Sequence, residues 1–200
     1  MAALFLPAPE LELHERFLTP EEGTAYFAAL RSTIAWRQDA MRIAGKSINL
    51  PRLTAWYGDP GTEHTYSGIL NVPEPWTPEL AEIKARAEAA AGAPFNAVLL
   101  NLYRTGSDSM GWHSDDEHDM SPIIASVSLG AARTFQLRRK EPPGDTVSMR
   151  LTSGSLLVMT GSTQRHWQHR VPKEPAEDER INLTFRRVLS PPSENLSPKR

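Results

Sequence analysis

Six short runs of strand-like composition follow one another in the second half of this 200-residue sequence. Glycine, proline and aspartate separate them, and many short strands punctuated in this way are typical of a β-sandwich or jelly roll. The runs cover residues 97–103, 123–129, 134–138, 147–151, 155–160 and 181–189. We therefore expect a mainly β, α+β chain whose core, a β-sandwich or jelly roll, occupies residues 94–189.

Two helix starts stand in the first half of the chain. Residues 19–22 place a threonine at the N-cap, a proline at the first helical position and a glutamate three residues after the cap. Residues 77–79 repeat the threonine–proline start, and Gly92 is the expected stop. Apolar residues at helical spacing follow both starts, so we expect two helices that support a sheet, preceded by an arm or edge strand over residues 1–18.

Composition narrows the class of protein further. Hydrophobic residues make up 40% and charged residues 23%, which indicates a globular chain. The absence of cysteine excludes disulfides, thiolate zinc sites and cysteine nucleophiles. No apolar run is long enough to span a bilayer, and the first residues lack a basic region. We expect a cytoplasmic monomer, associated with the nucleoid if the source is bacterial, with no membrane partner and a disordered tail over residues 190–200.

The net charge of −2 argues mildly against a strong, non-specific grip on duplex DNA. Residues 138–140 are nevertheless three consecutive basic residues, with Arg133 nearby. This run is either a local basic surface or a solvated loop end.

His113 and Asp115 are the first candidate metal ligands. They are two residues apart, so an extended backbone turns both side chains to the same face. Two histidines and one carboxylate with open positions are the usual arrangement in non-haem Fe(II) oxygenases, so a third ligand must come from elsewhere. The downstream candidates are His166 and His169, and spacing alone does not decide between them, although the Val-Pro after His169 favours extended backbone there. The alternative for His-x-Asp is an acidic, solvated loop.

A strand over residues 180–186 places Arg180, Asn182, Thr184 and Arg186 on one face and only apolar residues on the other. Arginine meets a carboxylate through two parallel hydrogen bonds, so this face suggests a lined cavity that binds carboxylates. Asn101 and Tyr103 alternate with leucines in the same way and add donors that suit a dicarboxylate. The competing interpretation is an exposed edge strand with its arginines in water.

The order Asn-x-Tyr, His-x-Asp, a later His and Arg-x-Asn-x-Thr-x-Arg resembles the AlkB family of Fe(II)/2-oxoglutarate-dependent dioxygenases, over residues 40–188. The resemblance implies one dioxygenase domain over residues 1–189, whose jelly-roll core over residues 94–189 is a double-stranded β-helix. It implies Fe(II) as the metal and 2-oxoglutarate and O2 as co-substrates. It implies as catalytic metal ligands His113, Asp115 and His169. It implies as 2-oxoglutarate ligands Asn101, Tyr103, Arg180, Thr184 and Arg186.

The resemblance also implies a nucleotide-recognition lid over residues 40–66. Pro51-Arg52 and Tyr57-Gly58-Asp59 are similar to the lid of the DNA-repair branch. The substrate contacts implied in this way are Gly45, Lys46, Tyr57, Gly58, Asp59 and Asp116. Of Trp56 and Tyr57, which point to opposite faces, one is expected in the core, and the other either lines a pocket or is packed as well.

One position departs from the family pattern. Members that favour duplex DNA carry an aromatic wedge just before the Gly-Lys of the hairpin, where this chain has Ala44 preceded by Ile43. The resemblance implies oxidative demethylation of alkylated bases such as 1-methyladenine and 3-methylcytosine in single- or double-stranded DNA. The alternatives are the same chemistry on RNA or on a protein side chain, and a non-catalytic jelly-roll binding module.

Overall fold

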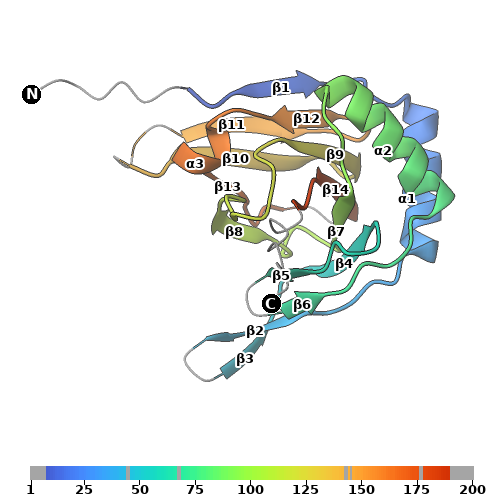
Figure 1. Cartoon of the computed structure of the whole chain (residues 1–200), viewed down its shortest axis with the longest axis horizontal. Coiled ribbons are helices and arrows are strands. Elements are labelled where there is room, and N and C mark those ends of the chain that lie inside the picture. The colour runs from blue at the N-terminus through green and yellow to red at the C-terminus, as the bar shows by residue number, and fades with distance from the viewer. Residues whose placement is uncertain are drawn as a thin grey trace, which may run out of the picture.

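Two antiparallel β-sheets face each other across the centre of the structure, a computed structural model that describes residues 8–43, 46–66, 69–141, 144, 146–175 and 178–189 (Figure 1). The larger sheet contains, in spatial order, β1 (Leu11–His14), β12 (Leu156–Met159), β9 (Ile124–Gly130), β14 (Arg180–Arg186), β7 (Ala97–Tyr103) and β4 (Leu53–Gly58). The smaller sheet contains β11 (Thr146–Leu151), β10 (Arg133–Arg139), β13 (Trp167–Val171) and β8 (Met110–His113). The expected mainly β jelly-roll class is confirmed.

Helices α1 (Pro20–Thr33) and α2 (Pro78–Ala91) cover the outer face of the larger sheet (Figure 1). Both begin as expected: Thr19 and Thr77 cap the first turns, and Thr19 forms a full capping box with Glu22. Gly92 ends α2 in the left-handed conformation, with a φ of 61°. The apolar alternate residues of β14, including Leu183 and Phe185, are fully buried beneath these helices.

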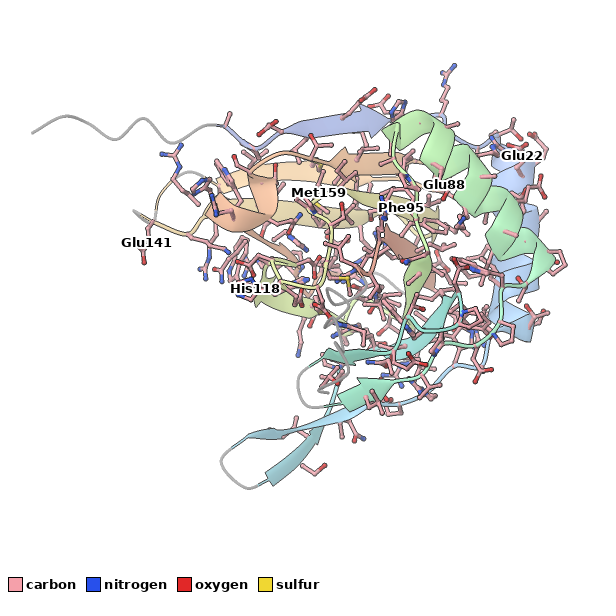
Figure 2. The ribbon with its side chains drawn as sticks, viewed as in Figure 1. Glu22, Glu88, Phe95, His118, Glu141 and Met159 are labelled. Carbon is pink, nitrogen blue, oxygen red and sulfur yellow. The ribbon has the colours of Figure 1, made fainter. Side chains whose placement is uncertain are left out.

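The opposite face of the larger sheet looks into the space between the sheets. At one end this space is filled by an apolar cluster that both sheets supply, with Met159 and Leu157 from the larger sheet and Phe135 and Leu137 from the smaller. Figure 2 shows how densely side chains fill this region and labels Met159 between the sheets and Phe95 on the helix side. The polar faces of β7 and β14 occupy the rest, so the sandwich interior holds both a core and a polar cavity.

Two hairpins extend beyond β4. They are β2 (Ala40–Ile43) with β3 (Lys46–Asn49), and β5 (His64–Tyr66) with β6 (Ile69–Asn71) (Figure 1). The predicted tip residues Ala44 and Gly45 lie outside the described residues, as does the predicted tail over residues 190–200. A single turn of helix, α3 (Thr163–His166), precedes β13. Among the described residues, no helix combines the length and the apolar character needed to cross a membrane.

Strands β8 and β13 were not among the six predicted runs. Both lack a clean apolar alternation, because their side chains serve the cavity on one side and a polar outer surface on the other. The extended backbone expected at His169 is present in β13. The predicted domain boundaries, 1–189 with a lid over 40–66, stay a prediction.

Candidate metal centre

Three side chains meet where β8 and β13 pair. His113 ends β8, Asp115 follows two residues later, and the antiparallel register sets His169 of β13 opposite His113. One ligand atom from each residue lies within 4.8 Å of the others, and the two imidazole centroids are 4.2 Å apart. His166 lies in α3 and is outside this cluster. The structure thus brings together the three residues predicted as metal ligands.

The protonation states at this cluster suit a metal. Burial, reinforced by His169, lowers the pKa of His113 to about 4, so its imidazole is neutral near pH 7. His113 Nδ1 lies 2.9 Å from the carbonyl oxygen of Gly111, which favours the proton on Nδ1 and leaves Nε2 for a metal. Burial alone would raise the pKa of Asp115, but Arg186, 2.9 Å away, and His169 outweigh it, so the net shift is downward. A carboxylate and two imidazoles are a donor set that fits Fe(II).

Four of the five predicted 2-oxoglutarate ligands line the same cavity. Side chains of Asn101 and Tyr103 from β7 and of Thr184 and Arg186 from β14 share its wall with the three metal ligands. They face the cavity because β7 and β14 are hydrogen-bonded neighbours in the larger sheet, and alternate residues of each turn to its inner face. Ser126 from β9 and Asn182 complete this polar stripe and hydrogen-bond each other at 2.8 Å.

Arg180 lies beside Tyr103 at one end of this stripe. Its guanidinium carbon is 5.3 Å from the Tyr103 ring centroid, and its Nη2 donates to Ser128 Oγ at 2.9 Å. The side chain is only 1% exposed, and its Nε and Nη1 have no hydrogen-bond partner among the described residues. Burial lowers the pKa of Arg180 to about 10, so it stays cationic. A buried cation with two unpaired N–H donors fits a carboxylate of a dicarboxylic acid.

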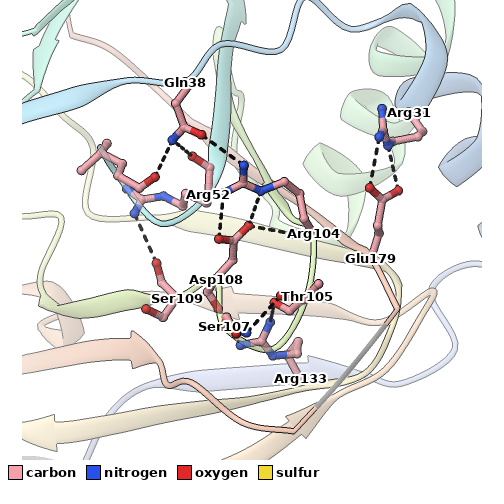
Figure 3. A network of polar contacts seen from close by, with 11 residues as sticks. Arg31, Gln38, Arg52, Arg104, Thr105, Ser107, Asp108, Ser109, Arg133 and Glu179 are labelled. Carbon is pink, nitrogen blue, oxygen red and sulfur yellow. Dashed lines mark hydrogen bonds and ion pairs between the residues drawn. The ribbon is translucent and has the colours of Figure 1, made fainter. Parts of the chain in front are cut away.

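Arg52 connects this cavity to the segment before β4, and its side-chain role was missed by the sequence reasoning. Arg52 is 4% exposed, and its Nε donates to Asn101 Oδ1 at 2.7 Å. Its Nη1 lies 3.4 Å from the Ser109 carbonyl oxygen (Figure 3). Because the amide oxygen of Asn101 accepts from Arg52, its NH2 group is free to donate to a ligand in the cavity. The resemblance of Pro51-Arg52 to a family motif was the one sequence signal for this residue.

A second cavity adjoins the first, and the two share Leu99 and Arg186 in their walls. The two hairpins and β4 cover it with Asp39, Trp56 and His64. The His64 ring is 6% exposed, and both its nitrogens lack a hydrogen-bond partner among the described residues, Nδ1 lying 3.5 Å from an Asp119 carboxylate oxygen. This cavity, between the metal cluster and the predicted lid, is the candidate substrate pocket.

The structure corrects one predicted substrate contact. Tyr57 lies in the core beneath α1 and α2, where its hydroxyl accepts from the Ala35 N–H at 3.1 Å. Trp56, its neighbour on β4, faces the second cavity instead and donates from Nε1 to the Thr62 carbonyl oxygen at 2.9 Å. The alternation along the strand was therefore predicted, but the residue that faces the pocket was not.

Three further predicted contacts, Gly58, Asp59 and Asp116, have other surroundings. Gly58 is buried at the end of β4, where an added Cβ would lie 2.6 Å from Thr62 Oγ1, and Asp59 accepts from Trp76 Nε1 at 2.7 Å. Asp116 is half exposed and pairs with Lys140 at 2.7 Å. Gly45 lies outside the described residues, and only the backbone of Lys46, in β3, is described.

Glu117 is a carboxylate that the sequence reasoning passed over. Its Oε2 is buried without a hydrogen-bond partner among the described residues, and the side chain lies beside Asp115 on the wall of a surface hollow. It stands two residues after a metal ligand, at the spacing that separates Asp115 from His113. His113, Asp115 and Glu117 are each two residues apart, and this spacing is the sequence pattern that would have indicated Glu117 as a further candidate.

The fold, the cluster of His113, Asp115 and His169, and the buried Arg180 together define an iron- and 2-oxoglutarate-dependent oxygenase. The family described as "2OG-Fe(II) oxygenase superfamily" matches residues 10–186. The expected Fe(II), 2-oxoglutarate and O2 are the cofactors of that superfamily. A solved structure described as "The structure of OsALKBH1" superposes with a TM-score of 0.65 at 20% identity, covering 91% of this chain and all of that one, which shows the shared fold.

Within this class the chain belongs to the AlkB family. It is 38% identical to the human "DNA oxidative demethylase ALKBH2", over 89% of this chain and 69% of that protein. It is 43% identical to the human "Alpha-ketoglutarate-dependent dioxygenase alkB homolog 3", over 90% of this chain and 66% of that protein. The bovine protein of the same name is 44% identical, and 65% of it is covered. The chain thus spans just under two thirds of the length of these alkB homolog 3 proteins.

Proposed function

We propose that this chain oxidatively demethylates alkylated bases of nucleic acid, using Fe(II) and 2-oxoglutarate. The observation that carries the proposal is the pair of adjoining cavities. One is lined by a His-Asp-His cluster and by Tyr103, beside which Arg180 has two unpaired donors. The other lies under two hairpins and shares a wall with the first. The names of the human relatives, a DNA oxidative demethylase and an alpha-ketoglutarate-dependent dioxygenase, support the same reaction and substrate class.

The residues of the first cavity would bind and orient the metal and its co-substrate. His113, Asp115 and His169 would hold Fe(II), which with 2-oxoglutarate and O2 supplies the oxidation of an N-methyl group that then leaves as formaldehyde. Arg180 would receive one carboxylate of 2-oxoglutarate in its unpaired Nε and Nη1 donors. Asn101, held by Arg52, would donate its amide N–H to the same ligand.

The second cavity would receive the base. A methylated ring position inside a duplex is stacked and out of reach, so the base must be flipped or already unpaired. Trp56 and His64 provide flat walls, with ring centroids 5.7 Å apart, and Asp39 provides a carboxylate able to accept from an exocyclic amino group. Because Arg186 and Leu99 belong to both walls, a base in the second cavity lies next to the metal cluster.

A substrate panel tests the proposal. Oligonucleotides carrying a single 1-methyladenine or 3-methylcytosine, as single-stranded DNA, duplex DNA and RNA, are compared with a methyllysine peptide for formaldehyde release. We expect release from methylated DNA, at least as fast from the single strand as from the duplex. Faster turnover of RNA would move the assignment to RNA demethylation. Release from the peptide alone would refute the nucleic-acid substrate class.

A further inference from the structure

Trp112 contacts two arginines on the outer face of the smaller sheet. It precedes His113 on β8, so alternation turns the indole away from the metal cluster. The guanidinium carbons of Arg138, on β10, and Arg170, on β13, each lie 4.4 Å from the Trp112 ring centroid. Two cations therefore share one aromatic ring directly behind the strand that carries a metal ligand.

Among the described residues, neither arginine pairs with a carboxylate. Arg138 donates from Nε and Nη2 to Gln168 Oε1, at 3.1 and 2.9 Å, and Arg170 donates from Nε to Gln136 Oε1 at 2.8 Å. Both partners are neutral amides. Among the ion pairs of the described residues, none includes Arg138 or Arg170, whereas Lys140 at the end of β10 pairs with Asp116. Two unbalanced cations side by side are notable in a chain whose net charge is −2.

This arrangement fixes the guanidinium groups while leaving donors available. The indole face and the glutamine oxygens restrict each group, so less rotamer entropy is lost when a ligand binds. The remaining N–H groups can donate to anionic oxygens, and a planar guanidinium suits a phosphate. Arg170 follows His169 on β13, so the cluster lies on the outer face of a strand that carries a predicted metal ligand.

We propose that Trp112, Arg138 and Arg170 form a clamp for the phosphodiester backbone of the nucleic-acid substrate. The inference rests on the proposed function, since it supplies the contact that positions a strand whose base enters the second cavity. Phosphate contacts supply most of the sequence-independent affinity for nucleic acid. A local clamp explains how a chain with slightly negative net charge can hold a polyanion.

The salt dependence of binding tests the clamp. A labelled 12-nucleotide single strand with one 1-methyladenine is titrated by fluorescence anisotropy between 50 and 200 mM NaCl, against wild-type chain and Arg138→Gln. Each phosphate contact contributes about 0.7 to the slope of log K against log salt for a single strand. We expect Arg138→Gln to flatten the slope by about 0.7, and Arg138→Gln combined with Arg170→Gln to flatten it by about 1.4.

Two controls distinguish the loss of a phosphate contact from unfolding of the variant and from failure of the proposed function. Arg16→Gln removes the same charge from an exposed position between β1 and α1 and should leave the slope unchanged. Arg138→Gln should also keep wild-type turnover of the free 1-methyladenine nucleoside, which has no phosphate. Equal slopes for Arg138→Gln and Arg16→Gln would overturn the clamp while leaving the demethylase intact. A wild-type chain that binds no oligonucleotide would instead overturn both proposals.

Discussion

Arg180→Lys is expected to separate ligand binding from folding stability. The wild-type guanidinium has Nε and Nη1 buried without a protein partner, which we assign to a carboxylate of 2-oxoglutarate. Lysine keeps the charge but replaces the planar fork with a point charge, so one charge-assisted hydrogen bond of about 1.5–3 kcal/mol is lost. The dissociation constant for 2-oxoglutarate should therefore rise by about 10- to 150-fold.

The assay is calorimetric titration of 2-oxoglutarate into the Mn(II)-loaded chain, with urea unfolding in the presence and absence of the ligand. At 100 times its dissociation constant a ligand stabilises the wild-type fold by about 2.7 kcal/mol, and a 100-fold weaker ligand by only about 0.4 kcal/mol. The unfolding free energy without 2-oxoglutarate should change little, because Nε and Nη1 of Arg180 have no hydrogen-bond partner to lose among the described residues.

Arg133→Lys is the matched control. Arg133 is as deeply buried, at 1% exposed, but its Nη1 and Nη2 donate to the carbonyl oxygens of Thr105, Asp108 and Pro172, and its Nε lies 3.1 Å from Glu174 Oε1 in an ion pair. Figure 3 shows Arg133 beside Thr105. This substitution should lower the unfolding free energy by about 1–3 kcal/mol and leave the stabilisation by 2-oxoglutarate unchanged. The reasoning is refuted if Arg180→Lys binds 2-oxoglutarate as wild type does, or if the two variants behave alike.

Three other predictions concern the metal, the co-substrate and the strand. His169→Ala should abolish Mn(II) binding, as measured by calorimetry, whereas His166→Ala, which lies outside the cluster, should retain it. Loss of Mn(II) binding in His166→Ala alone would contradict the assignment. Arg52→Met should weaken 2-oxoglutarate binding by about 3- to 10-fold, because the Asn101 amide loses its orienting bond of about 1 kcal/mol, and unchanged affinity would refute that role. Ala44→Phe should shift the ratio of repair rates towards duplex, since an aromatic wedge recovers about 1–3 kcal/mol of stacking, and a wild-type chain several-fold faster on duplex would contradict this.

Local signals predicted the helices and most strands because their causes are local. Thr19 and Thr77 cap their helices through contacts three residues away, and Gly92 ends α2 through its own backbone conformation. The alternation in residues 180–186 predicted which face of β14 is polar. Whether that face met a cavity or water depended on the second sheet, about which the strand itself carries no information.

Long-range contacts limited the rest of the site. The hydrogen bond from Arg52 to Asn101 joins residues that are 49 positions apart, so the sequence near either residue does not predict it. Trp56 and Tyr57 lie on opposite faces of β4 and are covered by different parts of the chain. The sequence of the strand does not say which part covers which face, so it could not decide which of the two residues faces the pocket. The cytoplasmic location, the monomeric state and the substrate contacts of Gly45 and Lys46 stay predictions.

Formaldehyde release from a single-stranded oligonucleotide carrying one 1-methyladenine tests the central claim most directly. The reaction is run with Fe(II) under air, with and without 2-oxoglutarate, and succinate is measured beside formaldehyde. We predict one succinate per formaldehyde, restoration of unmethylated adenine, no product without 2-oxoglutarate, and none from Asp115→Ala. Formaldehyde release that is independent of 2-oxoglutarate, or an Asp115→Ala variant as active as wild type, would contradict the assignment of this chain as an Fe(II)- and 2-oxoglutarate-dependent demethylase.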